Sequence, residues 1–209
     1  MPRIKRAVDY IEALHSSRDK EKSVLGEELK QYYDKWSRTL DPQDFLRFLE
    51  LIKENKDKIG VPQFFGKFRA YAFEEYVYRI INVKVTMPTH LQTFWGEKCI
   101  IWREGEKDYA IEFDVSIGKK LKIFVEPKMV FEAKVELDAA RLKTALASFA
   151  LLKKWNSRAK CVLVYLIKDF DTTLIKLAKN WVDGAFQFSI KTNELASFVD
   201  FVNKSLGEC

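Results

Sequence analysis

The stretch of sequence that decides the fold runs from residue 109 to residue 135 and reads YAIEFDVSIGKKLKIFVEPKMVFEAKV. Apolar and polar side chains alternate over residues 109–118, which is the period of a β-strand with one buried face. The same alternation returns over residues 129–135. Between the two runs, Gly118-Lys119-Lys120 predicts a turn. We therefore expect two strands that can pair as a hairpin.

Three charged side chains stand out in this hairpin. Asp114 lies on the polar face of the first strand, while Glu132 and Lys134 are two residues apart and so share a face of the second. If the strands pair, Asp114 approaches Glu132, and two carboxylates about 4 Å apart repel by roughly 4 kcal/mol at an effective dielectric constant of about 20. A divalent cation between them removes this cost, and oxygen ligands suit Mg²⁺ or Mn²⁺. Lys134 can then position an attacking water or stabilise charge on a phosphate.

The sequence before the hairpin predicts helices. Residues 1–58 show helical spacing of apolar side chains, with Asp41-Pro42 as a helix start, and Gly60 and Pro62 close this region. A further helix over 68–81 carries an apolar stripe. We expect a helical N-terminal subdomain over residues 1–62 and a core over residues 63–209. The stripe of the 68–81 helix consists of Phe73, Val77, Ile80 and Ile81.

The sequence after the hairpin alternates between helical and extended patterns. The continuous apolar run over 161–167 is typical of a strand covered on both faces. Together with the hairpin, this order predicts an α/β fold in which helices flank a mixed sheet. The other elements expected are a strand over 99–102, a helix over 138–155, a helix over 171–181, a strand over 185–189 and a helix over 193–206.

The charge of the chain is unevenly distributed. The net charge is +6, and residues 118–160 contain eleven basic and four acidic residues, so the whole excess lies in this stretch. A local positive field attracts phosphates. A lysine-rich solvated surface explains the same charge equally well, so charge alone does not decide the function.

Composition excludes several classes of protein. The longest apolar runs fall far short of the roughly 18 residues of a membrane-spanning helix, and the N-terminus has charges where a signal peptide would be apolar. Three cysteines without metal-ligand spacing fit a reducing, cytoplasmic compartment. With only His15 and His90, the chain has little material for a histidine-rich zinc site or a histidine-centred triad. The cysteines are Cys99, Cys161 and Cys209.

These residues together resemble the PD-(D/E)xK nuclease superfamily, which includes restriction endonucleases and Holliday junction resolvases. The matching elements are Asp114, then Glu132-Ala133-Lys134 on a strand, then a long helix, and the resemblance covers about residues 66–167. The residue before Asp114 is Phe113, whereas the family's name gives proline at this position; many members of the family also lack this proline. The resemblance implies a restriction-endonuclease-like mixed sheet flanked by helices.

The resemblance also implies roles for individual residues. Asp114 and Glu132 would bind Mg²⁺, for which Mn²⁺ could substitute, the Ala133 carbonyl would complete the ligand set, and Lys134 would assist the attacking water. Some members supply a further acid from the preceding helix; here we prefer Glu74 to Glu75, because Glu74 borders the apolar stripe. The candidate nucleic-acid contacts are Arg141, Lys143, Lys119, Lys120 and Lys122.

The function implied is that of a Mg²⁺-dependent endonuclease acting on double-stranded DNA, of the type II restriction kind. Cutting both strands usually needs two active sites, so a homodimer is expected. The N-terminal helical subdomain, residues 1–62, would supply target recognition or dimer contacts. Two alternatives stay open: a structure-selective repair or Holliday-junction nuclease with the same core, and a non-catalytic nucleic-acid-binding protein that kept the fold. RNA stays open as a substrate. A purely structural alternative makes Glu132 and Lys134 an edge-strand ion pair beside a solvated Asp114.

Overall fold

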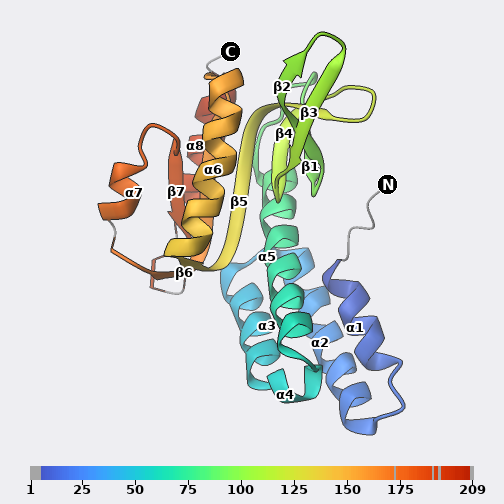
Figure 1. The fold of residues 1–209 in the computed structure, drawn as a ribbon. Coiled ribbons are helices and arrows are strands. Elements are labelled where there is room, and N and C mark those ends of the chain that lie inside the picture. Colours follow the sequence, from blue (N-terminus) through green and yellow to red (C-terminus); the bar gives the residue numbers. More distant parts are fainter. Residues whose placement is uncertain (1–5, 172, 190, 193, 208–209) are drawn as a thin grey trace.

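The computed structural model describes residues 6–207 apart from 172, 190 and 193. A seven-stranded mixed sheet forms the upper part of the molecule in Figure 1, and four helices form the lower part. A fifth, long helix, α5, rises from the lower part and packs against the sheet. The helices are α1 (Ala7–His15), α2 (Lys20–Thr39), α3 (Pro42–Glu54), α4 (Lys56–Ile59), α5 (Pro62–Lys84), α6 (Ala139–Trp155), α7 (Thr173–Leu177) and α8 (Leu195–Gly207). The strands are β1 (Gln92–Trp95), β2 (Lys98–Glu104), β3 (Lys107–Glu112), β4 (Val115–Lys120), β5 (Val125–Asp138), β6 (Lys160–Asp169) and β7 (Gly184–Gln187).

The predicted fold class, a mixed sheet flanked by helices, is confirmed. Strand β5 is its central member: it pairs antiparallel with β4 and parallel with β6, which in turn pairs with β7. The strand is long enough to change partners along its length. β4 pairs with residues 125–131 of β5, whereas β6 pairs with residues 129–138. Strand β5 therefore continues past the end of β4.

Aspartate caps fix where three helices begin. Asp41 accepts hydrogen bonds from the backbone N–H groups of Gln43 (2.8 Å) and Asp44 (3.1 Å), with Pro42 as the first helical residue. Asp19 caps α2 and Asp138 caps α6 in the same way. An N-cap carboxylate satisfies N–H groups that have no partner inside the helix, which is why the Asp41-Pro42 signal located a helix start correctly.

The alternating run over 109–118 does not form one strand, as expected, but two. Strand β3 pairs with β2, whereas β4 pairs with β1 and β5, so the chain changes partners at Phe113-Asp114. Phe113 packs on the α6 side, with its ring centroid 6.3 Å from that of Phe149, while Val115 joins the core beneath α5. The two halves of the run therefore bury their apolar residues in different cores.

The turn predicted at Gly118-Lys119-Lys120 is also wrong, because these residues end strand β4. The turn comes just after them, where the Leu121 N–H donates to the Phe124 carbonyl at 2.9 Å. Gly118 serves a different purpose: it lies at a bulge, and a Cβ there would come 2.2 Å from the Glu126 carbonyl oxygen. The lack of a side chain at Gly118 therefore allows β5 to approach β4 closely.

Two predicted helices differ in extent. The helix expected over 68–81 begins at Pro62, because proline suits the first turn of a helix, and it ends at Lys84. The helix expected over 171–181 is only α7, Thr173–Leu177, since the chain must then turn so that Asp183 can accept the Cys161 N–H (2.8 Å) before β7. The final helix is α8; its expected start, Asn193, lies outside the described residues.

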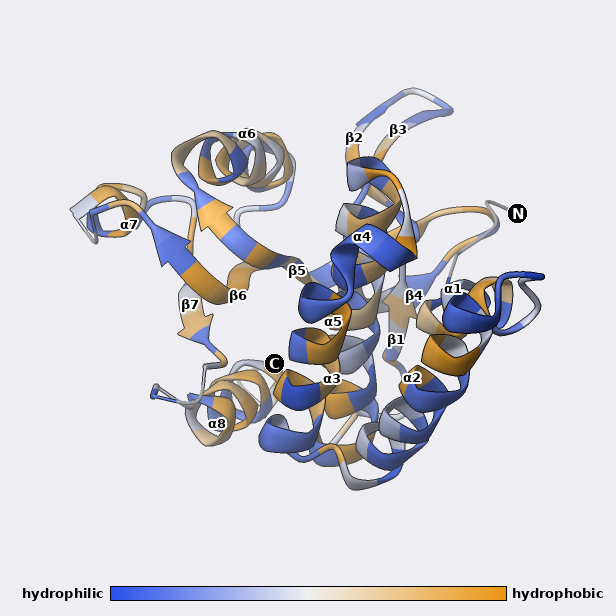
Figure 2. Ribbon diagram, turned by 90° about the horizontal axis from the view of Figure 1, so that it is seen from below, coloured by the Kyte–Doolittle hydropathy of each residue, from blue (hydrophilic) through white to orange (hydrophobic). Residues whose placement is uncertain are grey.

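The N-terminal helices share a buried core with one face of the sheet. The Trp36, Phe45 and Phe73 side chains are fully buried in the cluster that also contains Val115 and Phe131. Seen from below in Figure 2, apolar segments of α2, α3 and α5 face one another, and polar segments face outward. The division of the chain at residue 62 stays a prediction. Among the described residues, no helix combines the length and apolar character that a membrane crossing requires.

We predict that Gly26→Ala destabilises the protein, because the new Cβ would lie 2.4 Å from the His15 backbone nitrogen and force α1 from α2. Overpacking of this kind costs about 1–3 kcal/mol. Gly66→Ala is the matched control: no described atom lies within 4 Å of its Cβ, so it should gain about 1 kcal/mol of helix propensity. Urea denaturation measures both free energies of unfolding. A stabilising Gly26→Ala would contradict the α1–α2 packing.

Candidate active site

The candidate site lies just before the first residue of β4, where β5 continues without a partner on that side. Val115↔Phe131 is the pair at the start of β4, and Asp114 is the residue that precedes Val115 in the chain. The Asp114 side chain takes the place of a further strand residue: its Oδ2 accepts the Ala133 N–H at 2.8 Å. In an antiparallel ladder one residue turns both its N–H and its C=O to the same neighbour, so the Ala133 carbonyl is directed to this side as well.

Lys134 joins the two carboxylates of the cluster. Its Nζ lies 2.6 Å from Asp114 Oδ2 and 2.6 Å from Glu132 Oε2. The three side chains are only 11–23% exposed, so these are partly buried ion pairs in which geometry and hydrogen bonding matter more than at a surface. Over residues 132–134 strand β5 pairs with β6 but not with β4, so this stretch has the free edge of the structural alternative. That alternative also expects a solvated Asp114, whereas the Asp114 side chain is only 20% exposed and accepts the Ala133 N–H.

The electrostatics of the cluster reflect crowded acids. Burial first, and then the nearby Asp114 charge, raise the pKa of Glu132 to about 7 against the opposing effect of Lys134. Burial lowers the pKa of Lys134, but Asp114 and Glu132 outweigh it and raise that pKa above its usual value. The ammonium is thus held charged between the two acids. The closely spaced carboxylates are stabilised by a nearby positive charge, which Lys134 provides in this structure.

Glu74 of α5 faces the same cluster. Its Oε2 accepts the Trp95 Nε1–H at 3.2 Å, and a cavity of about 250 Å³ is lined by Glu74 together with Ala133 and Lys134. Burial raises the pKa of Glu74 well above its usual value, and Asp114 adds to the shift, whereas the Trp95 hydrogen bond and Lys134 oppose it. A third carboxylate therefore belongs to the electrostatic neighbourhood of the other two.

Glu75, the alternative to Glu74, points into the helical part of the molecule. It is 1% exposed, and its Oε1 accepts hydrogen bonds from the Tyr33 hydroxyl (2.7 Å) and the Arg79 guanidinium (2.8 Å). Its Oε2 accepts the Ala7 N–H at 3.3 Å. These contacts tie α1, α2 and α5 together. Neighbouring glutamates on one helix thus face opposite sides, Glu74 to the sheet and Glu75 to the helices.

The predicted basic residues lie at different places. Arg141 lines the small cavity beside Lys134, where its guanidinium pairs with Asp138 at 2.9 Å and donates to the Glu136 carbonyl at 3.0 Å. Lys143 is exposed on the next turn of α6. The three lysines near the β4–β5 turn lie at the far end of β4, roughly 16 Å or more from Asp114 at about 3.3 Å per residue. They are Lys119, Lys120, whose Nζ lies 2.8 Å from Glu97, and Lys122.

The donor chemistry of the site fits a hard cation. Asp114, Glu132 and the Ala133 carbonyl offer oxygen ligands, and Lys134 already places one positive charge between the two carboxylates. No three His, Cys, Asp or Glu side chains in the described residues are grouped to hold a metal ion. Mg²⁺, however, retains several waters and commonly uses only one or two carboxylates. A pair of acids is therefore sufficient for such an ion.

The sequence interpretation missed three residues around the site. Trp95 donates to Glu74, and the phenol of Tyr71 lies close enough for Glu74 and Asp114 to raise its pKa, after burial. Arg69 lines the small cavity five residues before Glu74. The helical period around Glu74 was a signal for Tyr71, three residues away. Arg69, which is not at a helical spacing from Glu74, and Trp95, which lies 21 residues from it, offered none.

No protein-family model matches the chain, and no curated protein sequence matches it. Among solved structures three chains match, and one belongs to the structure described as the native BbvCI A2B2 tetramer at low resolution. The alignment covers 87% of this chain and 82% of that chain, with a TM-score of 0.55 and 16% sequence identity. The fold is restriction-endonuclease-like. At this identity the likeness to BbvCI concerns the fold alone.

We predict that Glu75→Gln and Glu74→Gln, one residue apart, have opposite effects on stability. Glu75→Gln leaves the Arg79 charge without its buried partner, which should cost about 1–3 kcal/mol of unfolding free energy. Glu74→Gln removes a carboxylate crowded by Asp114 and should change stability by less than about 0.5 kcal/mol or increase it, as is common at functional positions. Urea denaturation of both variants compares them. Equal losses would mean that Glu74 is structural as well.

Proposed function

We propose that this protein is a Mg²⁺-dependent endonuclease that hydrolyses phosphodiester bonds of DNA, of the type II restriction kind. The observation that carries the proposal is the Asp114–Lys134–Glu132 cluster with the Ala133 backbone between its members. At the level of the fold, the similarity to BbvCI, a type II restriction endonuclease, supports a nuclease-like function. The PD-(D/E)xK resemblance supports the same assignment of residues.

Asp114, Glu132 and the Ala133 carbonyl would hold the Mg²⁺ ion, with Glu74 as the further acid. When bound, the ion would supply Lewis-acid polarisation of the scissile phosphate. The carboxylates are poised for a cation, because burial and mutual repulsion make them costly to keep ionised without one. The restricted exposure of the cluster also weakens screening by water, which strengthens each charge interaction inside it.

Lys134 would stabilise the negative charge that develops on the phosphate. Once a metal cation binds the two carboxylates, the Lys134 ammonium can donate N–H hydrogen bonds to a phosphate oxygen and to the attacking water. Hydrolysis adds one water across the P–O bond: the water oxygen bonds to phosphorus and releases a proton to solvent, the bond to the leaving sugar oxygen breaks, and that oxygen takes up a proton from solvent water.

Double-stranded DNA as substrate implies two sites in one assembly. Since one copy of the site cuts one strand, we propose that the chain acts as a homodimer. The BbvCI structure is a tetramer, A2B2, which supports an oligomeric form for this fold without specifying a homodimer.

We predict that the purified protein cuts plasmid DNA in the presence of Mg²⁺ and that EDTA abolishes the cutting. Asp114→Asn and Lys134→Ala should each reduce the cleavage rate by at least about 10²-fold, the usual loss when one charge-stabilising group is removed. Lys30→Ala is the matched control, because Lys30 lies on α2 outside the cluster, where it pairs with Asp34 and lies 5.9 Å from the centre of the Tyr33 ring. Gel electrophoresis of the products measures the rates.

The outcomes separate the candidate functions. Fragments with defined end sequences support a restriction enzyme, whereas preference for a four-way junction over linear duplex supports a structure-selective nuclease. Salt-sensitive DNA binding without metal-dependent cutting supports a non-catalytic binding protein. Full activity in the Asp114→Asn, Lys134→Ala double variant would end the proposal.

A further inference from the structure

Arg69 on α5 is a charged side chain with an unexplained position. Its side chain is only 12% exposed, and its Nη1 lies 3.1 Å from Glu136 Oε1. The guanidinium carbon lies 5.2 Å from the centre of the Phe65 ring. Its Nε is buried and has no hydrogen-bond partner among the described residues. A buried donor without an acceptor costs stability, so a ligand that supplies one would give this arrangement a purpose.

Arg69 lies where two cavities adjoin. The small cavity of about 250 Å³ is lined by Glu74 and Lys134, and its α5 wall includes the small residues Gly66 and Ala70. A second cavity of about 900 Å³ lies between α3 and the ends of β5, β6 and β7. Arg69 and Val135 line both cavities. We call the larger cavity, with Arg69 at its inner end, the basic groove.

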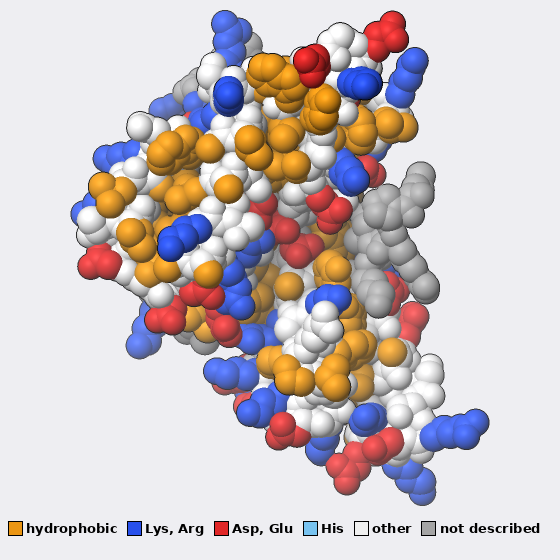
Figure 3. Space-filling model, viewed as in Figure 1, with side chains coloured by type: hydrophobic (Ala, Val, Ile, Leu, Met, Phe, Trp, Pro, Cys, Tyr) orange, Lys and Arg blue, Asp and Glu red, His pale blue; other side chains and the backbone are white. Residues whose placement is uncertain are grey.

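The basic groove has the charge of a polyanion site. Its lining contains five cationic side chains and one acidic side chain, Glu50, over an apolar floor that includes Leu49 and Leu166. Glu50 pairs with Arg47 at 2.6 Å, and Arg69 pairs with Glu136 of the adjoining cavity, so the formal charge of the lining residues together with Glu136 is +3. Figure 3 shows basic side chains gathered beside acidic ones in the hollow between the helical and sheet parts of the molecule. The cationic residues are Arg47, Lys53, Arg69, Lys168 and Lys191.

We propose that Arg69 binds a backbone phosphate next to the one that is cleaved, and that the basic groove carries the DNA strand away from the active site. This inference rests on the proposed function and adds the path of the substrate. Five residues of helix separate Arg69 from Glu74, about 7.5 Å along the axis, which is on the scale of neighbouring phosphates in one strand. A guanidinium can bind phosphate through two parallel N–H donors, and Nε–H is one of those donors.

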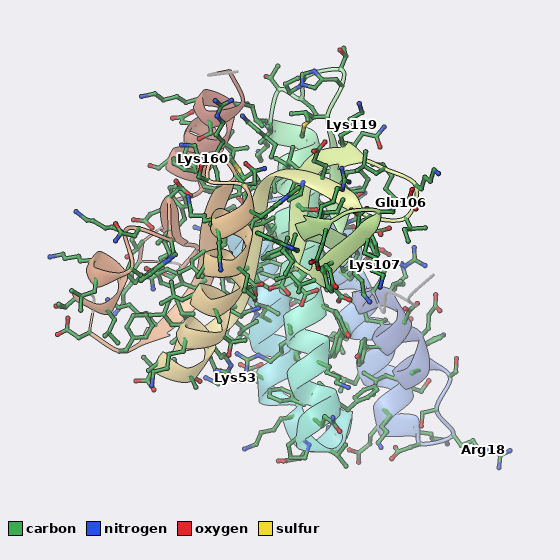
Figure 4. The ribbon with its side chains drawn as sticks, turned by 45° about the horizontal axis from the view of Figure 1, so that its top comes forward. Arg18, Lys53, Glu106, Lys107, Lys119 and Lys160 are labelled. Atoms are coloured by element: carbon green, nitrogen blue, oxygen red, sulfur yellow. The ribbon has the colours of Figure 1, made fainter. Side chains whose placement is uncertain are left out.

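The basic groove is better placed for this task than the lysines of the β4–β5 turn. It adjoins the small cavity lined by Glu74, Ala133 and Lys134, whereas Lys119 lies near the far end of β4. Figure 4 shows the two labelled residues on opposite sides of the molecule, Lys53 low beside α3 and Lys119 near the top. The small residues Gly66 and Ala70 would let a sugar–phosphate backbone approach α5 closely.

The test is binding of a fluorescein-labelled DNA duplex, followed by anisotropy in Ca²⁺ across a range of salt concentrations. Arg69→Ala and the exposed Lys53→Glu should each weaken binding by at least about tenfold, the loss expected for a charge-assisted contact. The slope of log K against log salt should fall by about one for Arg69→Ala. Lys20→Glu, the matched charge reversal at an exposed lysine of α2 outside the groove, should bind within about twofold of the parent protein.

The outcomes separate this inference from the function on which it rests. If the parent protein cuts DNA and both groove variants bind as tightly as it does, the groove inference is overturned and the nuclease stands. If the groove variants lose binding but the parent protein never cuts, the DNA path stands and the nuclease proposal fails. Displacement of the duplex by polyglutamate at equal charge concentration would overturn the groove inference in favour of acidic-peptide binding. Lys53→Glu lies on an exposed helix face, so it keeps the test decisive even if Arg69→Ala does not fold.

Discussion

The bridge from the Lys134 ammonium to the Asp114 and Glu132 carboxylates is the interaction on which the site depends. It exists because β5 extends beyond its pairing with β4: just before β4 begins, the Asp114 side chain reaches the Ala133 N–H that a further strand residue would otherwise have bound. Two acids are thereby held against one cation in a partly buried position. Asp114 lies in the short connection between β3 and β4, and its hydrogen bonds to Ala133 and Lys134 fix it against the strand that carries Glu132.

Helix α5 connects this site to the rest of the molecule. Its neighbouring glutamates do different work, since Glu74 adds negative charge to the carboxylate cluster while Glu75 fixes the N-terminal helices through Tyr33 and Arg79. A shift of α1 or α2 would therefore displace Glu75, the residue next to Glu74 of the cluster. The same helix carries Arg69 into the groove between the helical and sheet parts. Helix α5 therefore contributes both to the packing of the N-terminal helices and to the proposed path of the DNA.

The sequence predicted the secondary structure correctly where a local pattern is enough to determine it. The Asp41-Pro42 cap, the stripe through Phe73 and Val77, and the alternation over 129–135 all located elements that the structure contains. It failed where tertiary pairing decided the outcome. Nothing in the alternation over 109–118 marks the change of strand partner at Asp114, and Gly118 gave a turn signal although its role is close strand approach.

The candidate site was predictable in part for the same reason. Glu132 and Lys134 share a face because a strand has a period of two, and Asp114 reaches them because β4 and β5 pair. The preference for Glu74 followed from the helical period. The contact from Trp95 and the basic groove joined at Arg69 depend on segments brought together by the fold, which one sequence does not reveal.

Anomalous diffraction from crystals grown with Mn²⁺ would test the nature of the carboxylate cluster most directly. A peak between the Asp114 and Glu132 carboxylates and the Ala133 carbonyl, with Lys134 displaced from its bridge, is the result that a nuclease metal site requires. If Lys134 still bridges the two acids at saturating Mn²⁺ and no peak lies there, the cluster is a structural ion pair and the nuclease assignment is wrong.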